Sequence, residues 1–149
     1  MSDLEPGTVI VTATGDGHYT QQVSTAGHTF VVDEPVSVGG TDVGPNPYEL
    51  LLASLGSCTA ITVRMYADRK GIPLVRTTVR LQHDRIHAED CEKCETEHGM
   101  LSRITREITF EGDLDDDQRA RLMAIANHCP VHRTLTSEIV IETREIRPC

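Results

Sequence analysis

The fold is decided by residues 46–70, which read NPYELLLASLGSCTAITVRMYADRK. Asn46 is a favourable N-cap, Pro47 suits the first helical position, and Glu49 stands where it can close a capping box. Basic residues end the stretch, where they complement the negative end of a helix dipole, and Gly71 can adopt the left-handed conformation that stops a helix. These signals predict one long helix from Pro47 to about Lys70.

This predicted helix is apolar on nearly all sides. Leucine, isoleucine, valine and methionine recur around its circumference between Tyr48 and Ala67. A helix of this kind is surrounded by protein. A chain of 149 residues with 3% aromatics has little material to cover it completely, so we expect a second copy of the chain to cover part of it. The sequence therefore predicts an obligate homodimer.

Shorter elements flank the helix. β-branched residues predict three strands before it, at 8–14, 18–23 and 28–32. A glycine-rich loop at 37–46 follows them. After the helix, we expect a hairpin of strands 74–87 and 101–111, a helix from Asp115 until Pro130, a short helical restart at 131–133, and a last strand at 136–143. The length and the 38% hydrophobic content fit a single domain over 1–149.

The charge balance disfavours two classes of partner. The chain carries a formal net charge of -9, and residues 1–63 contain seven acids but no lysine or arginine. Nucleic acids and anionic membranes attract basic surfaces, so neither is an expected partner. The N-terminus lacks a basic segment followed by an apolar one, and no later window approaches the roughly 18 apolar residues that span a bilayer. We therefore expect a cytoplasmic protein without a targeting or membrane segment.

The five cysteines are too few for a disulfide scaffold and odd in number. Cys58 lies inside the predicted helix, where a small apolar core residue is the plainest interpretation. Its small neighbours, however, leave room for another backbone, a substrate or a second thiol. Cys129 lies at a helix end before Pro130, and the two thiols can cycle between dithiol and disulfide if they meet. Cys149 ends the chain and is assigned no role.

The densest cluster of potential metal ligands lies in the turn of the predicted hairpin, at about 87–98. His87, Cys91, Cys94 and His98 follow the pattern H-x3-C-x2-C-x3-H, and these are ligand types that zinc prefers. Five acids and one lysine fill the same stretch, which disfavours a thiolate nucleophile and favours a divalent cation. Three interpretations stay open for this loop: a zinc site, a solvated loop without a function, or a redox pair.

Two motifs resemble the OsmC/Ohr family of thiol-dependent peroxidases and related redox proteins. The first is GPNPYELLLASLGSC at 44–58, and the second is ANHCPV at 126–131. The resemblance covers most of the chain. It implies an α+β, OsmC-like fold in which two copies intertwine, with two long central helices packed between β-sheets built from both chains. The segment at about 87–98 is then a hairpin loop insertion in a single OsmC-like domain.

This resemblance also implies an activity. By the motifs, Cys58 matches the family's peroxidatic cysteine and Cys129 its resolving cysteine. The implied reaction is the reduction of a small organic hydroperoxide, in which Cys58 becomes a sulfenic acid and then forms a disulfide with Cys129. An external dithiol must reduce that disulfide. The peroxidase chemistry requires no metal or other cofactor, although zinc stays a candidate for the 87–98 loop.

Two departures from the family pattern concern activation of the thiolate. The family's glutamate directly follows the Asn-Pro pair, but Tyr48 stands there, and the one-residue shift turns Glu49 away by about 100°. Glu49 is therefore better interpreted as a helix cap. The family's arginine comes from the N-terminal strands, where this chain has no base. His132 and Arg133 are the candidates to replace it, and they equally suit a helix end.

Two functions remain. The first is a dimeric hydroperoxide reductase that uses Cys58 and Cys129. The second is a non-catalytic dimer of the same fold, which binds a small apolar ligand or a protein partner and either holds zinc or senses redox state at Cys91 and Cys94. The presence of both cysteines at the family positions favours the first, whereas the missing arginine and glutamate favour the second.

Overall fold

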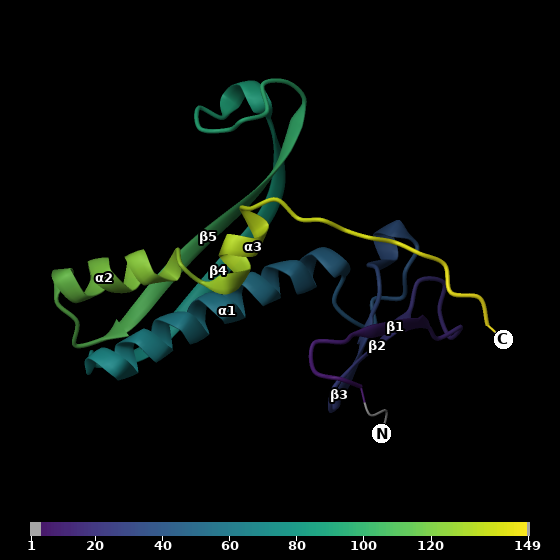
Figure 1. Cartoon of the computed structure of the whole chain (residues 1–149), viewed down its shortest axis with the longest axis horizontal. Helices are drawn as coiled ribbons and strands as arrows, with labels where there is room; N and C mark the ends of the chain where they lie inside the picture. Colours follow the sequence, from purple (N-terminus) through teal and green to yellow (C-terminus); the bar gives the residue numbers. More distant parts are fainter. Residues whose placement is uncertain (1–3, 149) are drawn as a thin grey trace. The chain divides into compact units, whose positions relative to one another are not determined.

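The computed structural model describes residues 4–148, and the chain divides into two compact units, Met1–Ala53 and Ser54–Cys149. Helix α1 (Pro47–Lys70) runs across the division. Its predicted capping box is present, because the Glu49 N–H donates to Asn46 Oδ1 (3.0 Å) and the Asn46 N–H donates to Glu49 Oε2 (2.9 Å). Gly71, with a φ of 64°, follows the last turn. The predicted long helix is confirmed (Figure 1).

The first unit contains a three-stranded antiparallel sheet with the order β1-β2-β3. Its strands are β1 (Ile10–Ala13), β2 (Gln21–Thr25) and β3 (His28–Val32). Val23 in the central strand lies opposite Val11 on one side and Phe30 on the other. A single turn of 3-10 helix, η1 (Val36–Val38), follows in the glycine-rich loop. The three predicted strands are thus confirmed, with altered bounds for the first two.

A buried carboxylate holds the glycine-rich loop of this unit. Asp33 is 2% exposed and accepts hydrogen bonds from the Thr41 hydroxyl (2.5 Å), the Thr41 N–H (3.1 Å) and the Glu34 N–H (2.8 Å). The hydrogen bond from the Thr41 hydroxyl contributes most to lowering the pKa of Asp33 to about 2. The backbone N–H donors add to this effect, and burial opposes it. At Gly40 the loop passes so close to Glu34 that a Cβ would overlap the Glu34 carbonyl oxygen.

Asp33→Asn is expected to lower the free energy of unfolding at neutral pH, because an amide retains only part of these bonds. A carboxyl group whose pKa is lowered in the folded state stabilises the fold fully above its ordinary value of 3.8, and this stabilisation is lost as the pH falls toward 2. The free energy of unfolding is measured by urea unfolding followed by circular dichroism. The difference in this free energy between wild type and variant should be constant from about pH 5 to 8 and should shrink below about pH 4.

Asp42→Asn is the control for this measurement. Asp42 is exposed in the same loop at a φ of 56°, a conformation that asparagine tolerates. Its replacement should change the unfolding free energy little at any pH. An Asp33→Asn difference that stayed constant down to pH 3 would show that the carboxylate charge does not hold this loop.

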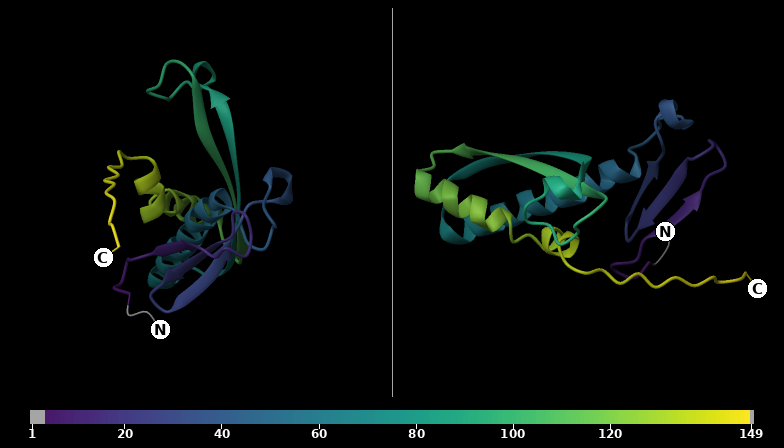
Figure 2. Two further views of the ribbon diagram at one scale, coloured as in Figure 1. Left: turned by 90° about the vertical axis from the view of Figure 1, so that its right-hand side faces the viewer. Right: turned by 90° about the horizontal axis from the view of Figure 1, so that it is seen from above.

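The second unit packs helices against a long hairpin. Strands β4 (Leu74–His87) and β5 (Met100–Gly112) pair in antiparallel orientation, with His87 opposite Met100 at the tip. Helix α2 (Asp116–Ala126) and the short helix α3 (Pro130–Leu135) follow. Figure 2 shows α2 and the greater part of α1 on the same side of the hairpin, whose tip extends beyond them. The predicted hairpin, second helix and helical restart are confirmed.

A hydrophobic core lies between these helices and the hairpin. Its buried members come from α1, α2 and both strands, with one more from the turn after α1: Val63, Ala67, Ile72, Leu74, Phe110, Leu122 and Ala126. Gly56 lets α1 approach β4 closely, because a Cβ there would crowd the Leu81 side chain. Leu81 lies opposite Arg106 in the middle of the hairpin. The α1 turn that carries Cys58 therefore lies over the middle of the hairpin.

The strand predicted for 136–143 is wrong. Residues 138–148 form no helix or strand, and the side chains of Ile139, Val140 and Ile141 are 53%, 79% and 83% exposed. Their β-branched pattern favours an extended strand, but a strand also needs an edge to pair with. Within residues 4–148, neither sheet pairs with this segment.

The expectation that no segment approaches a membrane span is also wrong. An 18-residue window of α1 has a mean hydropathy of 1.4, so the helix is long and apolar enough to cross a bilayer by length and composition alone. The core helix of a soluble protein passes the same test. Only 28% of this window is buried, which leaves much of the helix for another surface to cover.

Candidate functional site

Two free thiols meet where α1 lies over the beginning of α3. Cys58 is half-buried on α1, and Cys129 is fully buried at the N-cap of α3. The Cys58 side chain lies close enough to the Cys129 sulfur to help lower the pKa of the Cys129 thiol. The structure thus brings together the two cysteines that the sequence motifs single out.

The local sequence fixes the position of Cys129. Pro130 takes the first position of α3, which leaves the preceding cysteine as the N-cap. The Cys129 sulfur accepts a hydrogen bond from the His132 N–H (3.3 Å) and lies 3.7 Å from the Thr59 hydroxyl oxygen. A sulfur in the place of the usual capping oxygen therefore receives hydrogen bonds that favour its negative form.

An arginine that sequence reasoning missed lies beside these thiols. Arg106 of β5 donates through Nη1 to Thr59 Oγ1 (2.8 Å) and to the Ala126 carbonyl (3.2 Å), and through Nη2 to Asn127 Oδ1 (2.8 Å). These bonds hold the guanidinium between α1 and the end of α2. The signal was present in the alternation of β5, which places Arg106 on the inward, apolar face of the strand. A charge on such a face needs partners.

The electrostatics of the site favour a thiolate at Cys129. Burial raises the pKa of the Cys129 thiol, but the His132 N–H, the Thr59 hydroxyl, the Cys58 thiol and the Arg106 charge together hold it below its usual value. Burial and nearby positive charge, above all that of Arg106, lower the pKa of His132. The imidazole is therefore neutral at pH 7, and the cation beside the Cys129 sulfur is Arg106.

The structure places Glu49, His132 and Arg133 as follows. Glu49 closes the N-terminal cap of α1. Arg133 is exposed on α3, and its backbone N–H donates to the Cys129 carbonyl (3.1 Å). His132 donates to the Cys129 sulfur through its backbone N–H (3.3 Å). Among these three residues, His132 is the one that contacts the Cys129 sulfur, and it does so through its backbone.

A pocket of about 420 Å³ opens beside this cluster. Arg106 and His132 contribute polar groups to its wall, whereas Leu55, Ile104 and Leu135 contribute apolar ones. Leu55 lies about one helical turn before Cys58 on α1. The pocket therefore offers room for a small molecule with an apolar body next to the pair of thiols.

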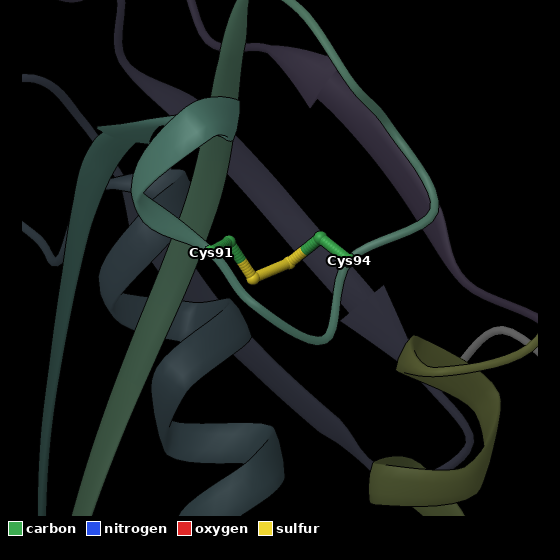
Figure 3. The surroundings of a disulfide bond; sticks show 2 residues. All are labelled: Cys91 and Cys94. Atoms are coloured by element: carbon green, nitrogen blue, oxygen red, sulfur yellow. A yellow bond between two sulfur atoms is a disulfide. The ribbon is translucent and has the colours of Figure 1, made fainter.

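The loop at the hairpin tip contains a disulfide. Cys91 and Cys94 are bonded to each other, with Cα atoms 5.5 Å apart (Figure 3). His98 pairs with Glu89 (3.5 Å), and no group of three or more metal-ligating side chains forms within residues 4–148. Zinc coordination by His87, Cys91, Cys94 and His98 stays a prediction for the reduced loop. Cys149 lies outside the described residues.

Two solved structures have the same fold as this chain. An OsmC-like protein from Mycoplasma pneumoniae superposes with a TM-score of 0.68 at 18% identity, over 89% of this chain and 88% of its own. The organic hydroperoxide resistance protein OhrB of Bacillus subtilis superposes with a TM-score of 0.59 at 22% identity, over 87% of this chain and 90% of its own. The predicted α+β, OsmC-like fold of the chain is therefore confirmed.

Sequence comparison supports the same relationship. A protein of Haloferax volcanii, described as uncharacterized, is 29% identical over 143 residues, which cover 93% of this chain and 92% of that protein. The model of the OsmC-like protein family matches residues 39–144, which include both motifs. The chain therefore belongs to the OsmC-like protein family.

Proposed function

We propose that this protein is a thiol-dependent peroxidase that reduces organic hydroperoxides with Cys58 and Cys129. The observation that carries the proposal is a pair of neighbouring thiols, of which one is accessible and the other has a lowered pKa. Cys129 is fully buried, so a peroxide meets Cys58 first. Proteins of this fold from Legionella pneumophila and Bacillus subtilis are described as organic hydroperoxide resistance proteins, which supports the substrate class.

The first step is attack of the Cys58 sulfur on one oxygen of the peroxide O–O bond. Cys58 passes its proton to the neighbouring Cys129 thiolate. The O–O bond breaks, and the leaving oxygen takes that proton to become an alcohol. Cys58 is now a sulfenic acid, and Cys129 is again a thiolate.

The second step joins the two cysteines. The Cys129 thiolate attacks the sulfur of the Cys58 sulfenic acid, an S–S bond forms, and the departing hydroxide takes up a proton to become water. The His132 N–H, the Thr59 hydroxyl and the Arg106 charge favour this step, because each lowers the pKa of Cys129. An external dithiol then reduces the disulfide, so one dithiol is oxidised for each peroxide reduced. This requirement fits the reducing cytoplasm, where we place the protein.

Consumption of cumene hydroperoxide at the expense of dithiothreitol tests this activity. The proposal predicts turnover with one dithiol oxidised per peroxide and cumyl alcohol as the product, without added metal. A rate no greater than that of free cysteine would overturn it. The pocket beside the thiols would then favour the second function, a non-catalytic dimer that binds a small apolar ligand.

We also propose that the protein works as a homodimer. On α1, Ile61 and Met65 are 58% and 67% exposed, although the helix is as apolar as a buried one. Residues 139–141 expose three more β-branched side chains. Apolar surfaces of this extent mark interaction sites, and a second copy offers both a matching helix and free strand edges. The two α1 helices then become the central helices of an intertwined pair.

Met65→Glu is expected to weaken this dimer, because it puts a charge into the apolar surface of α1. Light scattering after size exclusion should give twice the chain mass of 16.4 kDa for the wild type. The variant should give a smaller mass at the same micromolar concentration. Arg121→Glu, at an exposed position of α2, is the control and should stay dimeric. A wild type of single-chain mass would contradict the dimer.

A further inference from the structure

The proposed peroxidase makes no use of the loop at the tip of the hairpin. One turn of 3-10 helix, η2 (Ala88–Asp90), opens this loop, and the Cys91–Cys94 disulfide closes a short ring after it. Cys94 is exposed and Cys91 is half-buried. Another protein can therefore reach the disulfide drawn in Figure 3 from solvent, through the exposed Cys94.

This disulfide is separate from the Cys58–Cys129 site. Arg106, which contacts that site, lies opposite Leu81 in the hairpin, whereas the tip begins where His87 lies opposite Met100. Six residues of extended strand separate Arg106 from Met100, which corresponds to roughly 20 Å. Within one chain, the loop disulfide therefore does not exchange directly with the peroxidase thiols.

A structural role explains this disulfide poorly. The stabilisation that a crosslink gives grows with the length of the loop it closes, and here the two cysteines are only 3 residues apart. The long β4–β5 ladder already closes the hairpin without it. Exposed disulfides, in contrast, are the ones that tend to be labile and to exchange.

The charge around the loop selects the kind of partner. Five acids and a single lysine lie within residues 87–98, and Glu92 and Glu95 flank the cysteines at exposed positions. A negative surface of this kind attracts basic surfaces and repels acidic ones. A dithiol on a basic protein surface therefore approaches the disulfide faster than a dithiol on an acidic one.

We propose that Cys91–Cys94 is a second redox site, which accepts an electron pair from a protein dithiol carried on a basic surface. A thiolate of the dithiol attacks the exposed Cys94 sulfur, the Cys91–Cys94 bond breaks, and Cys91 leaves as a thiolate that takes up a proton. The second thiol of the donor then attacks its own sulfur in the mixed disulfide and releases Cys94. The donor ends as a disulfide and the loop as a dithiol.

Two synthetic peptides of equal length test this site in the full-length protein. Each contains a Cys-Gly-Pro-Cys dithiol, flanked by lysines in one peptide and by glutamates in the other. Reduction of the loop is followed by alkylation of Cys91 and Cys94 and mass spectrometry, with a metal chelator present. At low ionic strength the lysine peptide should react at least about tenfold faster. The two rates should become similar in about 0.5 M salt, because salt screens the charges.

Matched variants show whether the loop charges cause the difference in rate between the two peptides. Glu92→Gln with Glu95→Gln should narrow the difference between the peptides. Asp116→Asn with Asp117→Asn removes two exposed acids from α2 instead and should leave it unchanged. Equal rates for both peptides would overturn the proposal. So would free or zinc-bound Cys91 and Cys94 in protein purified in air.

This proposal stands apart from the peroxidase. The peptide experiment detects only the thiols of the loop, so its outcome does not depend on whether the protein reduces peroxides. Conversely, Cys91→Ser with Cys94→Ser should leave the first turnover with cumene hydroperoxide unchanged. Loss of that turnover would show that the loop belongs to the peroxidase site and would overturn the separation of the two.

Discussion

Cys58→Ser is expected to lower the rate of cumene hydroperoxide consumption by about three orders of magnitude or more. The remaining rate is the slow reaction of other exposed groups with the peroxide. The substitution removes the one sulfur of the pair that a peroxide can reach, because Cys129 is fully buried. A serine hydroxyl at the same place is a poor nucleophile toward an O–O bond. Loss of peroxide measured over time with pre-reduced protein checks this result.

Cys129→Ser separates the two steps of the reaction. This variant should still consume about one peroxide per chain, more slowly, since Cys58 loses the thiolate that takes its proton. No disulfide can form, so a sulfenic acid accumulates on Cys58 and can be trapped with a 1,3-dione reagent. If Cys129→Ser turned over like the wild type, Cys129 would not be the resolving cysteine.

Arg106→Gln is expected to slow formation of the Cys58–Cys129 disulfide by roughly 10- to 100-fold at pH 7, the effect of losing one charge-assisted interaction worth about 1.5–3 kcal/mol. Arg106 is one of the groups that hold the pKa of Cys129 below its usual value, together with hydrogen bonds that oppose the effect of burial. Without its charge, the thiolate forms only at higher pH. The rate of disulfide formation, measured by rapid quench from pH 5 to 10, should rise at a higher pH in the variant.

Controls distinguish this electrostatic role from a structural one. Arg106 also ties the end of α2 through Ala126 and Asn127, so a variant can lose stability as well. Lost stability alone lowers the rate equally at all pH values, whereas a lost charge moves the pH profile. Arg106→Lys keeps the charge and should partly restore the wild-type pH dependence of disulfide formation. Arg103→Gln, which removes an exposed arginine from the same strand, should leave this pH dependence unchanged.

Most of the fold could be predicted because its signals are local. The N-cap, the first-turn proline and the glycine after Lys70 fix the bounds of α1 within the sequence itself. The alternation of β4 and β5 likewise reports a hairpin. The segment 136–143 has an equally clear β pattern, but whether it pairs depends on an edge that lies elsewhere. A local pattern cannot supply that information.

In the candidate site, too, local motifs predicted some residues, whereas others depend on contacts between distant parts of the chain. The two motifs single out Cys58 and Cys129, and the structure brings these thiols together. Arg106 was missed because its relation to Thr59 is a contact between residues 47 positions apart, created only when α1 packs on β5. The family pattern places a cation on the N-terminal strands, and the sequence next to Cys129 offers His132 and Arg133, so neither indicates β5. The signal for Arg106 was an inward-facing charge on an amphipathic strand.

If Cys58 and Cys129 form a peroxide-reducing pair, one turnover must convert both thiols into a single disulfide. Pre-reduced protein is mixed with one equivalent of cumene hydroperoxide in a stopped-flow instrument, and the product is digested without reduction and analysed by mass spectrometry. We expect rapid loss of peroxide, with a new Cys58–Cys129 disulfide and one alcohol per disulfide. Loss of peroxide no faster than with free cysteine, or a product in which Cys58 and Cys129 remain thiols, would contradict it.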